Sequence, residues 1–126
     1  MKTLLAGSIL ILFLTGCSDK SGNNNDTELP VITINMPLTG QIFTSGQPII
    51  ISGGITDNKY VAEVHIHVTN TNTGTLLMDV HKFPANNTVA FNESITAAAG
   101  VNYKIQIVAT DKEVNEARAT VTVSCN

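Results

Sequence analysis

Between Pro30 and Ser124 the chain alternates apolar and polar positions in short segments that turn residues separate. The segments are rich in Val, Ile and Thr and cover residues 31–36, 48–53, 61–70, 76–83, 86–95, 101–109 and 117–125. A period of two places successive side chains on opposite faces of a strand, and many short strands between regular turns indicate an all-β sandwich. We therefore predict an antiparallel β-sandwich of about seven strands, which forms a single domain over residues 30–126.

Two details refine this pattern. No stretch after residue 17 has the periodicity of an amphipathic helix of useful length, so the fold class is all-β. Glu93 stands at an apolar position of the segment 86–95, and this misfit predicts a β-bulge there.

Residues 1–17 follow a different pattern. Lys2 precedes an apolar run over residues 4–14, which is shorter than the roughly 20 residues that a membrane-spanning helix needs. The run ends at Leu14-Thr15-Gly16-Cys17. This order of charge, apolar run, small residues and cysteine resembles the signal peptide and lipobox of bacterial lipoproteins. The resemblance implies a signal peptide over residues 1–16 and lipidation of Cys17, and an ordinary signal peptide followed by an unrelated cysteine is the alternative.

The residues after Cys17 link this segment to the domain. Ser, Gly, Asn and Asp dominate residues 17–29, which therefore have too little apolar surface to fold and are expected to form a flexible tether. Packing of these residues on the domain is the alternative. Acyl chains on one cysteine anchor a protein to a membrane without spanning it. In lipoproteins an Asp after the cysteine often retains the protein at the inner membrane. Ser18 therefore favours the outer membrane of the cell envelope.

Composition narrows the classes of function. The chain has seven basic and ten acidic residues and no basic patch, so nucleic acid is not an expected partner. No nucleophile–base–acid set and no G-x-S-x-G serine is present, so we do not expect an enzyme. With Cys17 acylated, Cys125 has no partner for an intrachain disulfide, and we expect it to be a small buried side chain.

The C-terminal third makes the fold more specific. Gly100 and Tyr103, at the start of a strand, resemble the tyrosine corner of immunoglobulin-like and fibronectin type III domains, in which the phenol binds the upstream backbone. The stretch VATDKEVNEARATVTV resembles the last hairpin of bacterial immunoglobulin-like and cadherin-like domains, which usually carry Gly where this chain has Val114. The resemblance covers residues 30–124 and implies an immunoglobulin-like sandwich, a fold that hosts many unrelated functions.

The densest group of metal-ligand side chains lies in EVHIHV and MDVH. His65 and His67 are two positions apart, so both lie on the polar face of one strand. A turn centred on Thr73 would pair His65 with His81, and His67 with Asp79, on the neighbouring strand. Three imidazoles and one carboxylate suit zinc, copper or nickel. A solvated polar face without a metal is the alternative.

A second candidate site lies at the pole from which the tether leaves. In this topology the loop with Asp57 and the loop with Asp111 and Glu113 meet there, and the tether brings Asp26 and Glu28 nearby. Several hard oxygen donors at one pole suit calcium. Ordinary loop caps are the alternative. We therefore expect no cofactor, and a bound Zn or Ca ion is the alternative hypothesis.

The opposite pole would project away from the membrane. It carries the loops 38–47, 70–75 and 96–100, whose Thr, Asn, Gln and Gly offer hydrogen bonds, with Phe43 as an apolar anchor. We therefore expect a lipid-anchored envelope protein with a non-catalytic binding or adhesion role towards a protein or glycan. The alternative is a metal-binding envelope protein that uses His65, His67, Asp79 and His81.

Overall fold

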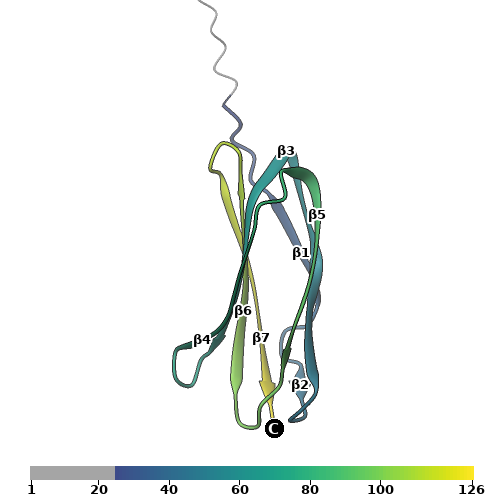
Figure 1. Cartoon of the computed structure of the whole chain (residues 1–126), viewed down its shortest axis with the longest axis vertical. Coiled ribbons are helices and arrows are strands. Elements are labelled where there is room, and N and C mark those ends of the chain that lie inside the picture. Colours follow the sequence, from purple (N-terminus) through teal and green to yellow (C-terminus); the bar gives the residue numbers. More distant parts are fainter. Residues whose placement is uncertain (1–24) are drawn as a thin grey trace, which may run out of the picture.

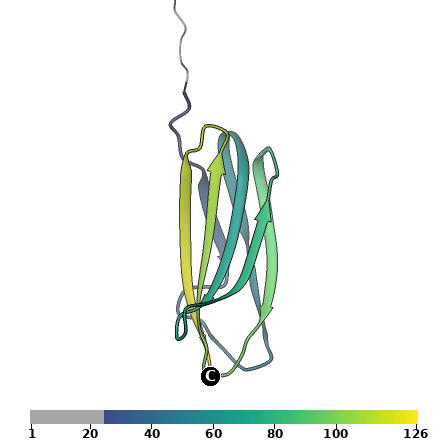
Figure 2. The same ribbon diagram turned by 60° about the vertical axis from the view of Figure 1, so that its left-hand side comes forward.

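The computed structural model describes residues 25–126, so the signal peptide and Cys17 lie outside the described residues. Seven strands form two layers that face each other along the long axis of the molecule (Figures 1 and 2). The strands are β1 (Val31–Met36), β2 (Ile42–Phe43), β3 (Pro48–Asn70), β4 (Thr75–Lys82), β5 (Asn86–Thr96), β6 (Asn102–Asp111) and β7 (Glu116–Cys125). Over residues 25–126, no helix is long and apolar enough to cross a membrane.

The long strand β3 belongs to both layers. Its first part pairs with β1 and β5, and its second part pairs with β4 and β6. The change of partners falls between Thr56 and Val61, where the ladder to β5 loses its register, and Figure 1 shows β3 bending there. β7 completes the second layer beside β6. All these pairs are antiparallel, and among residues 25–126 only the short β2 forms a parallel pair, with β7. The predicted all-β sandwich is confirmed.

Two details of the strand assignment were wrong. The segments 48–53 and 61–70, predicted as separate strands, are one strand, because β1 and β5 continue to pair with the backbone beyond Gly53. The short strand β2 was not predicted, because two residues carry no periodicity. The predicted number of seven strands therefore matches the structure only because two predicted strands are one strand and the additional strand β2 was not predicted.

The predicted bulge at Glu93 is also wrong. Glu93 lies opposite Ile51 in an uninterrupted part of the β3–β5 ladder. Its half-buried carboxylate forms an ion pair with Lys82, so the charge is neutralised at the edge of the core and needs no distortion of the strand. A charge-paired Glu can therefore occupy an inward-facing strand position that would otherwise be apolar.

The hydrophobic core fills the space between the two layers, and its side chains alternate along each strand as predicted. The fully buried members include Ile49, Ile51, Ile55, Val61, Val64, Ile66, Val68, Ile105 and Ile107. The tyrosine corner is present, because the backbone N–H of Ala98 donates to Oη of the buried Tyr103 at 2.7 Å. Cys125 is a buried member of the core, as predicted.

The loops gather at two poles in the predicted arrangement. The N-terminal segment and the β6–β7 loop lie at one end of the molecule, and the C-terminus lies at the other (Figure 1). Backbone hydrogen bonds join the loops at the end that holds the C-terminus, which we call the distal pole, from Gly46 N to Ala97 O and from Gly100 N to Cys125 O. Phe43 is only 8% exposed and packs in the core, so the expectation of an apolar anchor for a ligand was wrong there.

Candidate metal centre

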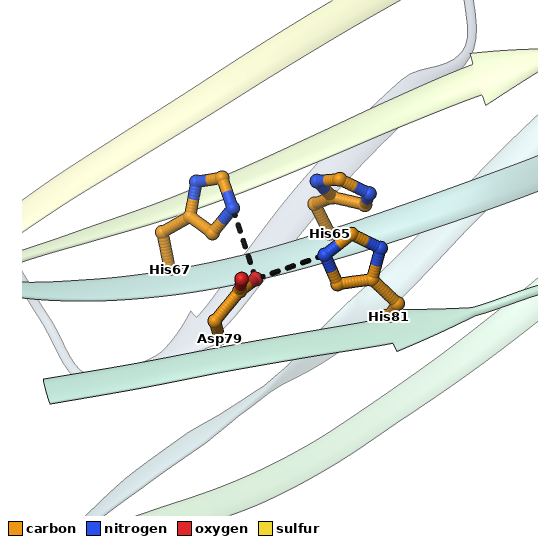
Figure 3. A group of neighbouring side chains, drawn as sticks. All are labelled: His65, His67, Asp79 and His81. Atoms are coloured by element: carbon orange, nitrogen blue, oxygen red, sulfur yellow. Dashed lines mark ion pairs between the residues drawn. The ribbon is translucent and has the colours of Figure 1, made fainter. Parts of the chain in front are cut away.

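Three histidines and one aspartate meet on the outer face of the β3–β4 hairpin, and we call this group the histidine cluster. His65 lies directly opposite His81, and His67 lies opposite Asp79, as the sequence predicts. The four side chains project from the same face of the two strands towards one another (Figure 3). Each has a ligating atom within 4.8 Å of a ligating atom of every other member.

The strand pairing near the turn of the β3–β4 hairpin differs from the pairing within the histidine cluster, and the sequence does not predict this difference. Near the turn Asn70 faces Thr75 and Thr69 faces Leu76, which is one residue out of step with the pairing of the cluster. An irregularity in the ladder after Val68 restores the step, so the pairings from Met78 onwards match a turn centred on Thr73. The left-handed conformation of Gly74, with φ of 76°, supports the tight turn.

Asp79 occupies the centre of the histidine cluster. Its Oδ1 lies 3.2 Å from Nε2 of His67 and 3.1 Å from Nε2 of His81, so a single oxygen contacts two imidazoles (Figure 3). The ring centroids of His65 and His81 lie 3.4 Å apart with the planes tilted by 49°. The cluster is therefore held together by one bridging carboxylate and by ring contact across the two strands.

Glu63 is a neighbour of the histidine cluster that the sequence reasoning did not assign to the site. Its Oε1 lies 2.6 Å from Nε2 of His65 and 3.6 Å from Nδ1 of His81. A carboxylate beside a ligating histidine fixes the orientation of the ring and increases its basicity. The sequence could have predicted Glu63 as a neighbour of the cluster, because residues 63, 65 and 67 lie on one face of a strand with a period of two.

The distances within the cluster suit a tetrahedral ion. Zinc binds imidazole nitrogen and carboxylate oxygen at about 2.0–2.2 Å, so two donors on one ion lie roughly 3.3–3.5 Å apart. The contacts of Asp79 with His67 and His81 are already close to this separation. His65 and His67 are half-buried, whereas Asp79 and His81 are exposed, so an ion can enter from solvent. The histidine cluster can thus offer up to four ligands of the borderline class that Zn²⁺ and Cu²⁺ favour.

A second group of ligands lies at the pole of the N-terminal segment, and we call it the aspartate cluster. It consists of Asp26, Asp57 in the bend of β3, and Asp111 at the end of β6, with ligating oxygens within 4.8 Å of one another. Two of the predicted calcium ligands, Asp57 and Asp111, are therefore brought together. Glu113 does not belong to the group: it is exposed and lines a separate pocket with Lys59, Tyr60 and Lys112.

Asp26 takes the place that the prediction gave to Glu113. Nδ2 of Asn58 donates to Asp26 Oδ1 at 3.0 Å, and the side chain of Asn115 donates to the carbonyl oxygen of Asp26 at 2.7 Å. The hydrogen bond from Asn58 and a second from the backbone of Glu28 lower the pKa of Asp26, against desolvation and with a small contribution from Lys59. This part of the expected tether therefore packs on the domain.

The comparisons with known proteins concern the fold. No protein-family model matches the chain, and no curated protein matches it in sequence. The chain is similar to the fibronectin(III)-like modules of Clostridium thermocellum CbhA, with a TM-score of 0.55 and 24% identity over 76% of this chain. The match covers 46% of that CbhA chain, so this protein spans less than half of its length.

Two further structures share the fold. A variant of the superoxide reductase (neelaredoxin) from Ignicoccus hospitalis has a TM-score of 0.51 and 10% identity, covering 78% of this chain and 80% of its own. The CARDB domain of the PF1109 protein from Pyrococcus furiosus, solved in complex with di-metal ions, has a TM-score of 0.50 and 16% identity, covering 79% and 90%. The domain is thus an immunoglobulin-like β-sandwich of the kind found in fibronectin III-like and CARDB domains.

Proposed function

We propose that this chain is a lipid-anchored protein of the cell envelope, and that its sandwich domain is a non-catalytic binding module for a transition-metal ion. The histidine cluster is the binding site, and Zn²⁺ or Cu²⁺ is the ligand. One observation carries the proposal: the ligating atoms of His65, His67, Asp79 and His81 all lie within 4.8 Å of one another.

The composition of the chain strengthens this interpretation. The whole sequence contains three histidines, and all three lie in this one patch. A polar strand face that needs only solubility can be built from any hydrophilic residues, so it does not require imidazoles. Glu63 adds the carboxylate that commonly orients a ligating imidazole, so the patch contains both direct ligands and a supporting group.

Titration calorimetry of the purified full-length protein with zinc chloride tests the proposal. We expect one ion per chain and a dissociation constant in the micromolar range or tighter. Removal of supporting partners alone lowers metal affinity by about 10–100-fold, so His67→Ala and Asp79→Asn should weaken binding by at least roughly that factor. Thr120→Ala is the matched control, because Thr120 lies in register with Gln106, the neighbour of His67, on the same sheet but outside the cluster.

The outcomes separate metal binding from a polar face. No heat from the wild-type protein at millimolar zinc would remove the proposal, as would equal affinities for the wild type and both cluster variants. Nitrogen hyperfine structure in the paramagnetic resonance spectrum of the copper-loaded protein, with fewer nitrogen couplings in His67→Ala, would identify imidazoles as ligands. A spectrum with oxygen ligands alone would contradict the assignment.

The lipid anchor has its own test. Mass spectrometry of the protein from native membranes should find Cys17 acylated and at the N-terminus of the mature chain. The substitution Cys17→Ser should release the protein from the membrane fraction without changing zinc affinity. An unmodified Cys17 would leave the histidine cluster as the proposed ligand site but would remove the anchor.

A second candidate function is recognition of a glycan or protein at the distal pole. An open pocket of about 290 Å³ lies there, lined by Gly40, Thr71, Asn102, Tyr103, Thr122, Val123 and Ser124. Hydroxyl and amide groups of this kind bind sugars through hydrogen bonds. Chemical-shift mapping with a panel of oligosaccharides should move the amides of this pocket, and shifts confined to the β3–β4 face would count against it.

A further inference from the structure

We infer that the aspartate cluster is a second cation site, of different chemistry from the histidine cluster, which binds Ca²⁺ and fastens the N-terminal segment to the sandwich. The inference does not rest on the histidine cluster, because it concerns other residues at one end of the molecule.

The three carboxylates come from distant parts of the sequence. Asp26 belongs to the N-terminal segment, Asp57 lies in the bend where β3 passes between the layers, and Asp111 ends β6. Their oxygens approach within 4.8 Å of one another, and Asp111 is only 2% exposed. Like charges at such short range, and partly out of water, disfavour one another unless a cation lies between them.

The hydrogen bonds around the aspartate cluster leave two oxygens without a donor. Asp111 is satisfied by the backbone N–H and side-chain amide of Asn115, and Oδ1 of Asp57 accepts from the backbone of Lys59. By contrast, Oδ2 of Asp26 and Oδ2 of Asp57 are buried and accept no hydrogen bond. A buried carboxylate oxygen is normally paired or coordinates a metal, so two such atoms in one cluster point to a cation ligand.

Among the described residues, Lys and Arg side chains do not neutralise the aspartate cluster. In the part of the chain that the structure describes, no Lys or Arg nitrogen forms an ion pair with any of the three aspartates. The pKa of Asp26 is lowered mainly by the hydrogen bonds from Asn58 and Glu28, and Lys59 adds only a small electrostatic effect. The negative charge of the aspartate cluster is therefore left for an external ion.

Coordination chemistry favours calcium among common hard cations. Calcium accepts about 6–8 oxygen ligands at about 2.3–2.6 Å in a flexible geometry, which suits carboxylates that come from three separate segments. Magnesium requires a near-ideal octahedron at about 2.0–2.1 Å and usually keeps several waters, so it binds through one or two carboxylates. Three protein carboxylates with water in the remaining positions suit a calcium site of moderate affinity.

Calcium binding would control the junction between the N-terminal segment and the domain. One ion ligated by Asp26, Asp57 and Asp111 ties residue 26 to the bend of β3 and to the β6–β7 loop at once. Hydrogen bonds from Asn58 and Asn115 to Asp26 already hold this segment in position, so the ion would reinforce an existing geometry.

Calcium titration of the full-length protein, with thermal unfolding measured in calcium chloride or in EGTA, tests this inference. We expect a dissociation constant in the range of about 10⁻⁵–10⁻³ M and a rise in Tm of several degrees at saturating calcium. Asp57→Asn and Asp26→Asn should each weaken calcium binding at least tenfold. In EGTA, Asp57→Asn should be no less stable than the wild type, because it removes one of three crowded charges and keeps the oxygen that accepts from Lys59.

Glu113→Gln is the matched control, since it removes one exposed negative charge from the loop that follows Asp111 but lies outside the aspartate cluster. It should keep the full calcium-dependent rise in Tm, and His67→Ala should keep it as well. No binding at about 10 mM calcium, or an equal loss in Glu113→Gln and Asp57→Asn, would overturn the inference. Hydrogen exchange supplies a further readout, because calcium should slow exchange of the amides around residues 26–29, and an unchanged rate would refute the fastening role.

Discussion

Gly53 and Gly54 are adjacent in β3, yet the structure predicts opposite effects when each is replaced by alanine. Gly53 faces Ile34 of β1 on one side and Phe91 of β5 on the other. A Cβ at Gly53 would lie 2.0 Å from the carbonyl oxygen of Thr33 and 2.6 Å from Cζ of Phe91. A Cβ at Gly54 would meet nothing closer than 3.7 Å, which is an ordinary van der Waals contact.

The size of the destabilisation by Gly53→Ala depends on which atoms must move to make room for the new Cβ. The Phe91 ring can rotate, but the carbonyl of Thr33 is backbone, so β1 has to shift away from β3. Overpacking costs about 1–3 kcal/mol, and weakening of the two or so backbone hydrogen bonds beside Gly53 adds roughly 1 kcal/mol each. Alanine in place of glycine restricts the unfolded chain equally at both positions, which stabilises by about 0.4–1 kcal/mol. We expect Gly53→Ala to lose about 3 kcal/mol and Gly54→Ala to gain about 0.5 kcal/mol.

Urea unfolding followed by far-ultraviolet circular dichroism measures both values, with thermal melts as a second readout. For a domain of this size 1 kcal/mol corresponds to about 4–8 °C, so Gly53→Ala should lower Tm by roughly 12–24 °C. Because the unfolded-state contribution is shared, the difference between the two variants reports the close contacts of Gly53 with Thr33 and Phe91. Equal stabilities of the two variants would refute the packing of β1 against β3 described above.

Three other stability predictions follow from single positions. Val114 adopts a left-handed conformation with φ of 68° while 78% exposed, so Val114→Gly should raise stability by about 1 kcal/mol, seen as a higher urea midpoint. Tyr103→Phe removes the acceptor for Ala98 N–H and should lower stability by about 1 kcal/mol in the same assay; no change would indicate that water replaces the phenol. Phe43→Ala should destabilise by about 3–5 kcal/mol, and a smaller loss than about 1 kcal/mol would show that Phe43 is not a core residue.

The sequence predicted the layers and the histidine cluster because both depend on the period of two. Burial of Val64, Ile66 and Val68 determines which face of residues 61–70 packs on the core. A shift of the pairing with residues 76–83 by one position would move buried side chains to the solvent-exposed face. The pairing of the histidine cluster was predicted correctly, although the pairing next to the turn was not. The irregularity after Val68 compensates for the difference of one residue between the two. Burial on one face thus determined the pairing more strongly than the loop did.

The predictions that were wrong concern residues whose positions depend on long-range contacts and not on the alternation of apolar and polar residues. The continuity of β3 depends on hydrogen bonds from β1 and β5, which leave no trace in residues 53–60. Phe43 was predicted to be an apolar anchor for a ligand, but β2 pairs with β7 and the Phe43 side chain is buried in the core. Asp26 was expected near Asp57 and Asp111 but in a flexible tether, and its packing on the domain depends on side-chain amides from the bend of β3 and from the β6–β7 loop. Long-range contacts of this kind have no local signature.

The entry of the chain at one pole and the direction of β1 determine how the domain would respond to tension. The N-terminal segment enters at one end of the molecule and the distal loops lie at the other (Figure 1). A pull between these ends runs along the antiparallel β1 and β3, so the hydrogen bonds of their ladder are loaded together in shear and do not open one after another. A force between these ends would therefore have to break several backbone hydrogen bonds of this ladder at the same time before β1 separates from β3.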